Sequence, residues 1–129
     1  MTDLLLDTHV FLWWQKESDA IGRAARDAIA DPDNRVFVSA ASVWEIAIKA
    51  RRGKLTFQVS PTAAIAAQGF FELPVLAIEA EAAGMLEWNH TDPFDRLLVA
   101  QAIRLSMVFV TADSVVRRYG PLPQLWAGP

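Results

Sequence analysis

The sequence predicts an α/β fold, with a central parallel β-sheet covered by helices on both faces. Short apolar runs typical of buried strands recur along the chain, and helical patterns separate them. No linker, repeat or low-complexity tract interrupts this alternation. The chain has 129 residues, of which 53% are hydrophobic, so a single domain over residues 1–129 with a full core is expected.

Two strands are expected in the first half of the chain, at residues 4–6 and 36–38. Ser39 is the expected N-cap of the next helix, because its hydroxyl can accept a hydrogen bond from the first helical turn. The helices of this half are expected at residues 11–14, 20–30 and 40–50, and from Pro61 onward.

The second half contains the clearest helix and the clearest strand. Asp92-Pro93 combines an N-cap with a proline at the first helical position, and the helix is expected to run to Leu105. The best strand is at residues 107–110. A short edge strand at residues 73–76, a helix at 79–87, a short helix after Asp113 and a last edge strand within 122–126 complete the expected order.

Composition and charge exclude several classes of site. Because the chain has no cysteine, it cannot form disulfides, thiolate zinc sites or cysteine nucleophiles. The apolar N-terminus carries Asp3 and Asp7 without a basic residue, and no run reaches the roughly 18 apolar residues of a membrane span, so a cytoplasmic protein is expected. A net charge of −3 and a pI of about 5.3 argue against nucleic-acid binding by the overall electrostatic field.

Four acidic residues are predicted to gather at one edge of the sheet. Parallel strands end at the same edge, which is where ligands bind in such folds. Asp7 follows the first strand, and Asp113 follows the strand at residues 107–110. Glu45 is the only acid of a largely apolar helix that starts at this edge. Asp95 precedes apolar residues at i+3, i+4 and i+7, which places it on the stripe expected to face the core.

Each acid also has a structural interpretation. Asp113 can cap the helix after it, Asp95 can be favoured by the helix dipole, and Glu45 can pair with Lys49. Asp7 ends a buried strand, and no capping role is apparent for it. As a set, the acids indicate more than structure, because two carboxylates about 4 Å apart repel by roughly 4 kcal/mol at an effective dielectric near 20. Mg²⁺ or Mn²⁺ would neutralise them best, since the chain offers no cysteine or paired histidine for zinc.

Four segments together resemble the PIN-domain family, and within it the VapC-type ribonuclease toxins of type II toxin–antitoxin pairs. These segments are LLLDTHVFLWW, SAASVWEIAIKARRGKL, HTDPFDRLLVAQA and FVTADS. The resemblance implies a three-layer sandwich with a central parallel sheet and an acidic pocket that binds Mg²⁺ or Mn²⁺. The catalytic and metal-binding residues that it implies are Asp7, Glu45, Asp95 and Asp113.

By the same resemblance, the chain is expected to hydrolyse phosphodiester bonds of single-stranded RNA with a water activated by one or two metal ions. The expected partners are RNA, a second copy of the chain and a VapB-type antitoxin that covers the site, and no membrane. Asp92 is expected to be a helix N-cap, with a supporting electrostatic role left open. Thr8 and Thr111 flank site acids and are expected to hold a water or a carboxylate.

Several other residues have two interpretations or none. The basic stretch at residues 49–54 can follow an RNA backbone or form a solvated helix end. Arg96 can contact phosphate or pair with a neighbouring acid. His90 is expected in a loop without an assigned role. The chain has five tryptophans, and Trp44 is expected to pack in the core.

Other classes of function compete with a nuclease. A receiver-type phosphoacceptor domain has a similar length and binds Mg²⁺, but it needs an acid pair after the first strand and a late lysine. Here Asp7 is followed by Thr8, and the segment after Val110 is Thr-Ala-Asp. A non-catalytic interaction domain would not need all four acids. A phosphatase with a DxD motif would need a second acid, where this chain has His9.

Overall fold

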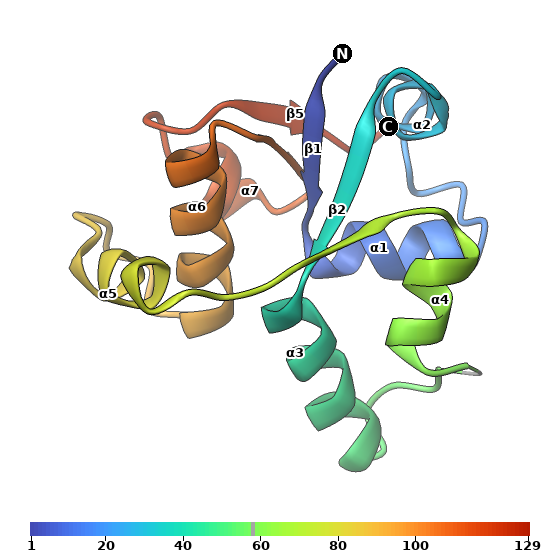
Figure 1. Cartoon of the computed structure of the whole chain (residues 1–129), viewed down its shortest axis with the longest axis horizontal. Coiled ribbons are helices and arrows are strands. Elements are labelled where there is room, and N and C mark those ends of the chain that lie inside the picture. Colours follow the sequence, from blue (N-terminus) through green and yellow to red (C-terminus); the bar gives the residue numbers. More distant parts are fainter. Residues whose placement is uncertain (58) are drawn as a thin grey trace.

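The computed structural model describes residues 1–57 and 59–129 and shows a three-layer α/β sandwich (Figure 1). Within these residues a sheet of five parallel strands has the order β3-β2-β1-β4-β5. The strands are β1 (Asp3–Leu6), β2 (Arg35–Ser39), β3 (Phe71–Leu73), β4 (Val108–Thr111) and β5 (Gln124–Trp126). The predicted fold class is therefore confirmed.

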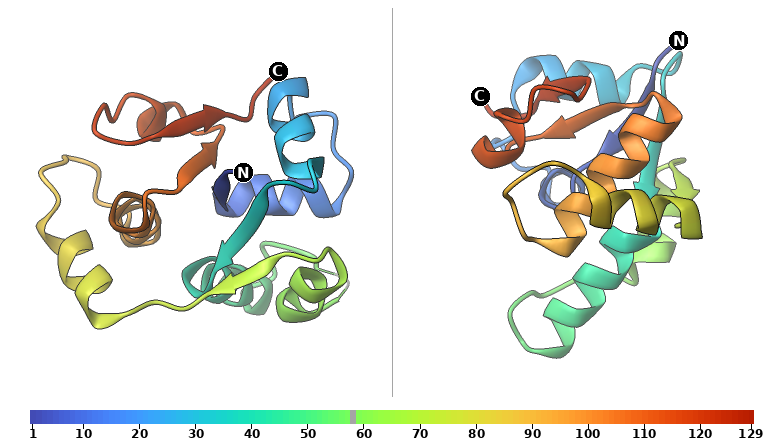
Figure 2. Two further views of the ribbon diagram at one scale, coloured as in Figure 1. Left: turned by 45° about the horizontal axis from the view of Figure 1, so that its top comes forward. Right: turned by 90° about the vertical axis from the view of Figure 1, so that its left-hand side faces the viewer.

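Helices cover both faces of the sheet. They are α1 (Thr8–Gln15), α2 (Arg23–Ala30), α3 (Ala40–Arg51), α4 (Pro61–Ala67), α5 (Ala77–Met85), α6 (Pro93–Leu105) and α7 (Ser114–Arg117). Figure 2 shows α1 and α2 on one face of the sheet and α5 and α6 on the other. Helix α3 extends beyond the end of β2, below the sheet in Figure 1. Among the described helices, none is long and apolar enough to span a bilayer.

Alternating side chains of the strands feed two separate cores. Leu4 and Leu6 of β1 belong to the core that includes residues of α1 and α2, whereas Leu5 belongs to the core formed with α6 and α7. In β4, Val110 and Phe109 divide between the two cores in the same way. Because both faces of the sheet are buried, the strands appear in the sequence as continuous apolar runs.

Local chemistry starts several helices where the sequence predicts. Ser39 caps α3 by accepting a hydrogen bond from the Ala41 amide at 3.0 Å. The Asp92 carboxylate caps α6 by accepting one from the Asp95 amide, also at 3.0 Å. Helix α6 begins at Pro93 and ends at Leu105, as expected.

Several predicted elements differ in their bounds. Helix α1 begins at Thr8 and not at residue 11, because Asp7 caps it directly after β1. Strand β3 covers Phe71–Leu73 where residues 73–76 were expected, and it stops before Pro74, which has no N–H to continue the ladder with β2. It lies at the sheet edge, as predicted. Helix α2 begins after Gly22, since the extended Gly22 donates its N–H to the Ala127 carbonyl at 2.8 Å. Helix α5 begins before residue 79, because the Glu79 side chain accepts a hydrogen bond from the Leu76 amide and closes the first turn from within.

Candidate active site

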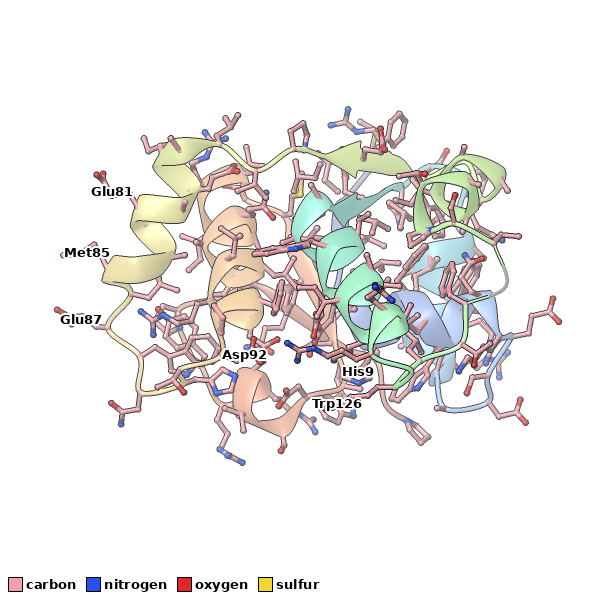
Figure 3. All side chains as sticks on the ribbon, turned by 90° about the horizontal axis from the view of Figure 1, so that it is seen from below. His9, Glu81, Met85, Glu87, Asp92 and Trp126 are labelled. Atoms are coloured by element: carbon pink, nitrogen blue, oxygen red, sulfur yellow. The ribbon has the colours of Figure 1, made fainter. Side chains whose placement is uncertain are left out.

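Three of the four predicted acids come together beyond the carboxyl ends of β1 and β4. Leu6 is in register with Val110, and the Asp7 amide donates to the Val110 carbonyl at 2.9 Å, so the residues after the two strands lie side by side. Figure 3 views the molecule from this side, with Asp92 labelled at the start of α6 and His9 labelled in α1. The carboxyl edge of the sheet is therefore the candidate site, as the fold class predicts.

Asp7 is held in a fixed position and is only 4% exposed. One carboxylate oxygen accepts a hydrogen bond from the Thr8 amide and the other from Thr111 Oγ1, both at 2.7 Å. Burial raises the pKa of Asp7, and the Asp113 charge adds to this, while the two hydrogen bonds and His9 oppose it. Asp7 is also the N-cap of α1, a role the sequence did not reveal because the helix begins directly after the strand.

Asp95, in the first turn of α6, shares this electrostatic environment. Its side chain is 16% exposed, and its Oδ2 lies 2.7 Å from His90 Nε2. Burial raises the pKa of Asp95 to about 6, helped by the negative charges of Asp7, Asp92 and Asp113 and opposed by the hydrogen bond with His90. Four aspartates from three separate chain segments therefore act on one another here.

Thr111 links two of the aspartates. Its hydroxyl donates to Asp7 and accepts a hydrogen bond from the Asp113 amide at 3.1 Å. Asp113 caps α7 through its carboxylate, which accepts from the Val115 amide at 2.8 Å. The structural interpretation of Asp113 is thus confirmed, and the expectation that Thr111 holds a carboxylate is confirmed as well. Thr8 holds Asp7 through its amide, while its hydroxyl donates to Ser42 at 2.9 Å.

Glu45 lies on α3 and differs from the aspartates, because it has a cationic partner. Its carboxylate forms an ion pair with Lys49 at 2.9 Å, as its structural interpretation predicts. Ser42, one turn earlier on the same face of α3, contacts Thr8 beside Asp7. This places Glu45 on the face of α3 that meets the start of α1. The three aspartates, by contrast, form no ion pair with a lysine or arginine in the part of the chain that the structure describes.

The donor chemistry of this site fits a hard divalent cation. Carboxylate oxygens are the ligands that Mg²⁺ and Mn²⁺ prefer, and the raised pKa values of Asp7 and Asp95 show negative charge that a cation would relieve. Over residues 1–57 and 59–129, no three histidine, aspartate or glutamate side chains stand close enough to hold an ion as they are.

Two residues beside the acids have contacts that the sequence did not predict. His90, to which no role was assigned, bonds Asp95. Arg96 does not pair with a neighbouring acid: its guanidinium donates five hydrogen bonds to backbone carbonyls between α5 and α6. One of these carbonyls belongs to His90, at 3.0 Å. Arg96 therefore holds the segment that carries His90 to Asp95. The five acceptors are Ala83, Gly84, Leu86, Trp88 and His90.

Trp44 is not a core residue, and the prediction that it packs there is wrong. It is 63% exposed and contacts Phe94 of α6. Helix α3, which carries Trp44, extends past the end of β2 (Figure 1).

Comparisons with known proteins agree with this architecture. A family model described as PIN domain matches residues 4–121. Ribonuclease VapC22 of Mycobacterium tuberculosis is 31% identical over 123 residues, which cover 92% of this chain and 93% of the relative.

Two solved structures share the fold at low sequence identity. VapBC2 from Rickettsia felis, bound to a DNA fragment from its promoter, has a TM-score of 0.70 and 14% identity over 96% of this chain and 98% of that chain. VapBC-1 from nontypeable Haemophilus influenzae has a TM-score of 0.66 and 18% identity over 96% and 97% of the two chains.

Proposed function

Because the chain belongs to the PIN-domain family, we propose that it is a VapC-type endoribonuclease that hydrolyses RNA phosphodiester bonds with the help of a divalent metal ion. One observation carries the metal dependence. Asp7, Asp95 and Asp113 come from separate elements, lie within one electrostatic environment and have no lysine or arginine partner among the described residues. Such an arrangement costs stability unless a cation compensates it.

The four acids divide into two groups by their surroundings. Asp7 and Asp95 would hold Mg²⁺ or Mn²⁺ directly, since burial already disfavours their charged forms. Asp113 and Glu45 would hold it directly or through water. When bound, the cation supplies the positive charge that lowers the pKa of a water and offsets charge on the phosphate oxygens.

Neighbouring groups keep the carboxylates in place. Thr111 fixes one oxygen of Asp7 and also binds the amide of Asp113, so it sets the spacing of these two residues. His90 fixes one oxygen of Asp95 and is in turn held by Arg96. These contacts lower the entropy lost when the site closes on a substrate. A bound cation would also resolve the difficulty of an acidic protein that binds RNA, because it makes the pocket attractive to phosphate.

The comparisons also support a partner. The curated relative is a VapC ribonuclease, and the two similar structures are VapBC complexes. We therefore propose that the chain is the toxin of a toxin–antitoxin pair, that it forms a homodimer in the cytoplasm and that a VapB-type antitoxin covers its site.

Cleavage of a fluorogenic single-stranded RNA by the purified protein tests the activity. We expect cleavage with Mn²⁺ or Mg²⁺ and none with chelator. Asp7→Asn and Asp95→Asn should each lower kcat by about 100-fold or more, because each removes charge that holds the cation. Asp3→Asn is the matched control: Asp3 lies at the opposite end of β1, pairs with Arg35, and should be dispensable for cleavage. If Asp7→Asn cleaves as fast as the parent in an RNase-free preparation, Asp7 does not belong to the site.

A further inference from the structure

An aromatic pair, exposed Trp44 and partly buried Phe94, lies next to the acidic residues in the sequence. The rings of Trp44 and Phe94 meet edge to face, with centroids 5.3 Å apart and an interplanar angle of 67°. Trp44 is 63% exposed and belongs to neither core, so most of its indole is open to solvent. An exposed indole adds little to folding, and large exposed aromatic side chains are typical of binding surfaces.

The pair lies next to the acids on both of the helices that it joins. On α3, Trp44 directly precedes Glu45; on α6, Phe94 directly precedes Asp95. Successive side chains of a helix diverge by about 100°, so each helix presents an acid and an adjacent aromatic ring. Asp95 interacts electrostatically with Asp7 and Asp113. The Trp44–Phe94 pair therefore lies one residue along each helix from an acid of the proposed site.

Charge alone gives this chain little affinity for RNA. The net charge is −3, and Lys49, the first cation of the basic stretch at residues 49–54, is paired with Glu45. Arg51, Arg52 and Lys54 can add contacts to phosphates, but these contacts do not recognise a base. Contacts to the bases must come from other side chains. Every nucleobase has a π-face, and stacking on an aromatic side chain is the usual uncharged contact of single-stranded nucleic acids. The edge of one ring meets the face of the other in the Phe94–Trp44 pair, and this contact favours one orientation of the indole.

We propose that Trp44, oriented by Phe94, stacks on an unpaired base of the RNA next to the phosphodiester that is cleaved. The inference rests on the proposed nuclease function, since it places the base beside the same acids. It makes Trp44 a specificity-determining residue: the substrate must present an extrahelical or single-stranded base at that position, because a base stacked within a duplex cannot reach the indole.

Steady-state kinetics with a single-stranded RNA separate stacking from catalysis. Trp44→Ala should raise KM by about ten-fold with kcat nearly unchanged, because stacking contributes to substrate binding in ground and transition states alike. Trp44→Phe, which keeps a ring, should recover most of the loss. Met85→Ala is the matched control: Met85 is 77% exposed and labelled on the outer side of α5 in Figure 3, and its loss should leave KM unchanged.

A series of RNAs with one abasic position each identifies the stacked base. In the parent, one abasic position should raise KM about ten-fold; in Trp44→Ala the same position should cost almost nothing, as expected when two changes remove one contact. Equal costs in both proteins at every position would overturn the proposal. An unchanged KM for Trp44→Ala would also overturn the proposal. If this variant in addition elutes at a different volume on size exclusion, the Trp44 surface forms a contact between copies of the chain.

Binding of a fluorescein-labelled RNA, measured by anisotropy in chelator, keeps this test independent of cleavage. One outcome is that the parent binds the RNA about ten-fold more tightly than Trp44→Ala in chelator and yet does not cleave it when Mn²⁺ or Mg²⁺ is added. In that case the nuclease function fails while the stacking surface stands. If the parent cleaves and both proteins bind equally, the stacking surface fails alone.

Discussion

Glu79 and Asp95 are acids of the α5–α6 side that lie largely out of solvent, and the surroundings shift their pKa values in opposite directions. Glu79 is fully buried and accepts hydrogen bonds from the Leu76 amide, Gln101 and Arg104 at 2.9–3.1 Å. Burial alone would raise the pKa of Glu79, but these bonds and the Arg104 charge outweigh it and leave the pKa below its usual value. Asp95 has only His90 as a side-chain partner and three aspartates nearby, and its pKa rises to about 6.

This difference separates a structural acid from a candidate functional one. Burial by itself does not distinguish them, since Glu79 is the more deeply buried of the two. The distinguishing property is whether the protein's own groups compensate the charge. A compensated carboxylate stabilises the fold, whereas an uncompensated one raises the free energy of the folded state and is available to bind a cation.

Removing the compensated acid should have the larger effect on stability. Glu79→Ala removes the ion-pair partner of the partly exposed Arg104 and one of the two acceptors of the buried Gln101, and the free energy of unfolding should fall by about 3 kcal/mol. Asp7→Asn should change it by less than about 1 kcal/mol in metal-free protein, because a neutral side chain keeps the cap and ends the desolvation of a charge. Urea denaturation measures both. If Asp7→Asn lowers the free energy of unfolding as much as Glu79→Ala does, Asp7 is a structural acid, and the distinction between compensated and uncompensated acids fails.

The pH dependence of stability should differ between the two acids. The pKa of Asp95 lies near 6 in the folded chain and near 3.8 when unfolded, so the folded state binds the proton more tightly. Its contribution to stability is therefore complete below pH about 4 and is lost as the pH rises through about 6. Relative to Asp95→Asn, the metal-free parent should lose about 2–3 kcal/mol over this interval. The contribution of Glu79 to stability depends on pH in the opposite way, because its pKa is lowered on folding. This contribution is present at neutral pH and is lost on acidification.

Parallel curves of stability against pH for the parent and Asp95→Asn would contradict the raised pKa of Asp95. Glu79→Gln serves as the reference, since its curve should approach that of the parent at acid pH and fall below it at neutral pH.

A smaller effect than that of Glu79→Ala is expected at Arg96, which acts on the site through the backbone. Lysine carries three donors on one nitrogen and cannot reproduce the five hydrogen bonds of the guanidinium. Arg96→Lys should lower the free energy of unfolding by about 1–2 kcal/mol and speed amide exchange in the segment between α5 and α6. Arg23→Lys, at a 94% exposed side chain, should do neither. Unchanged exchange in that segment would show that Arg96 does not hold it.

How far the sequence predicts this structure depends on how local each signal is. Helix α6 was predicted to the residue because Asp92 and Pro93 set its start through their own chemistry. Strand β3 was misplaced because Pro74 lies in an apolar run whose pairing with β2 only the assembled sheet decides. The sheet edge at which Asp7 and Asp113 meet followed from the fold class alone.

Contacts that depend on the packing of several elements could not be predicted from the sequence. Trp44 was assigned to the core because large apolar side chains usually pack there, and only the position of α3 past the sheet leaves it exposed. His90 reaches Asp95 because Arg96 holds the segment between α5 and α6, an arrangement with no sequence signature. The capping role of Asp7 was missed because the sequence does not show how closely α1 follows β1.

The central claim is that the uncompensated aspartates at the carboxyl edge form one cation site. Anomalous scattering from a crystal soaked in Mn²⁺ tests this most directly, because it locates the ion and its ligands together. We predict an anomalous peak in contact with the carboxylates of Asp7 and Asp95, and its loss in Asp7→Asn. A peak bound elsewhere on the molecule, with none at this edge in a preparation that cleaves RNA with Mn²⁺, would contradict the claim.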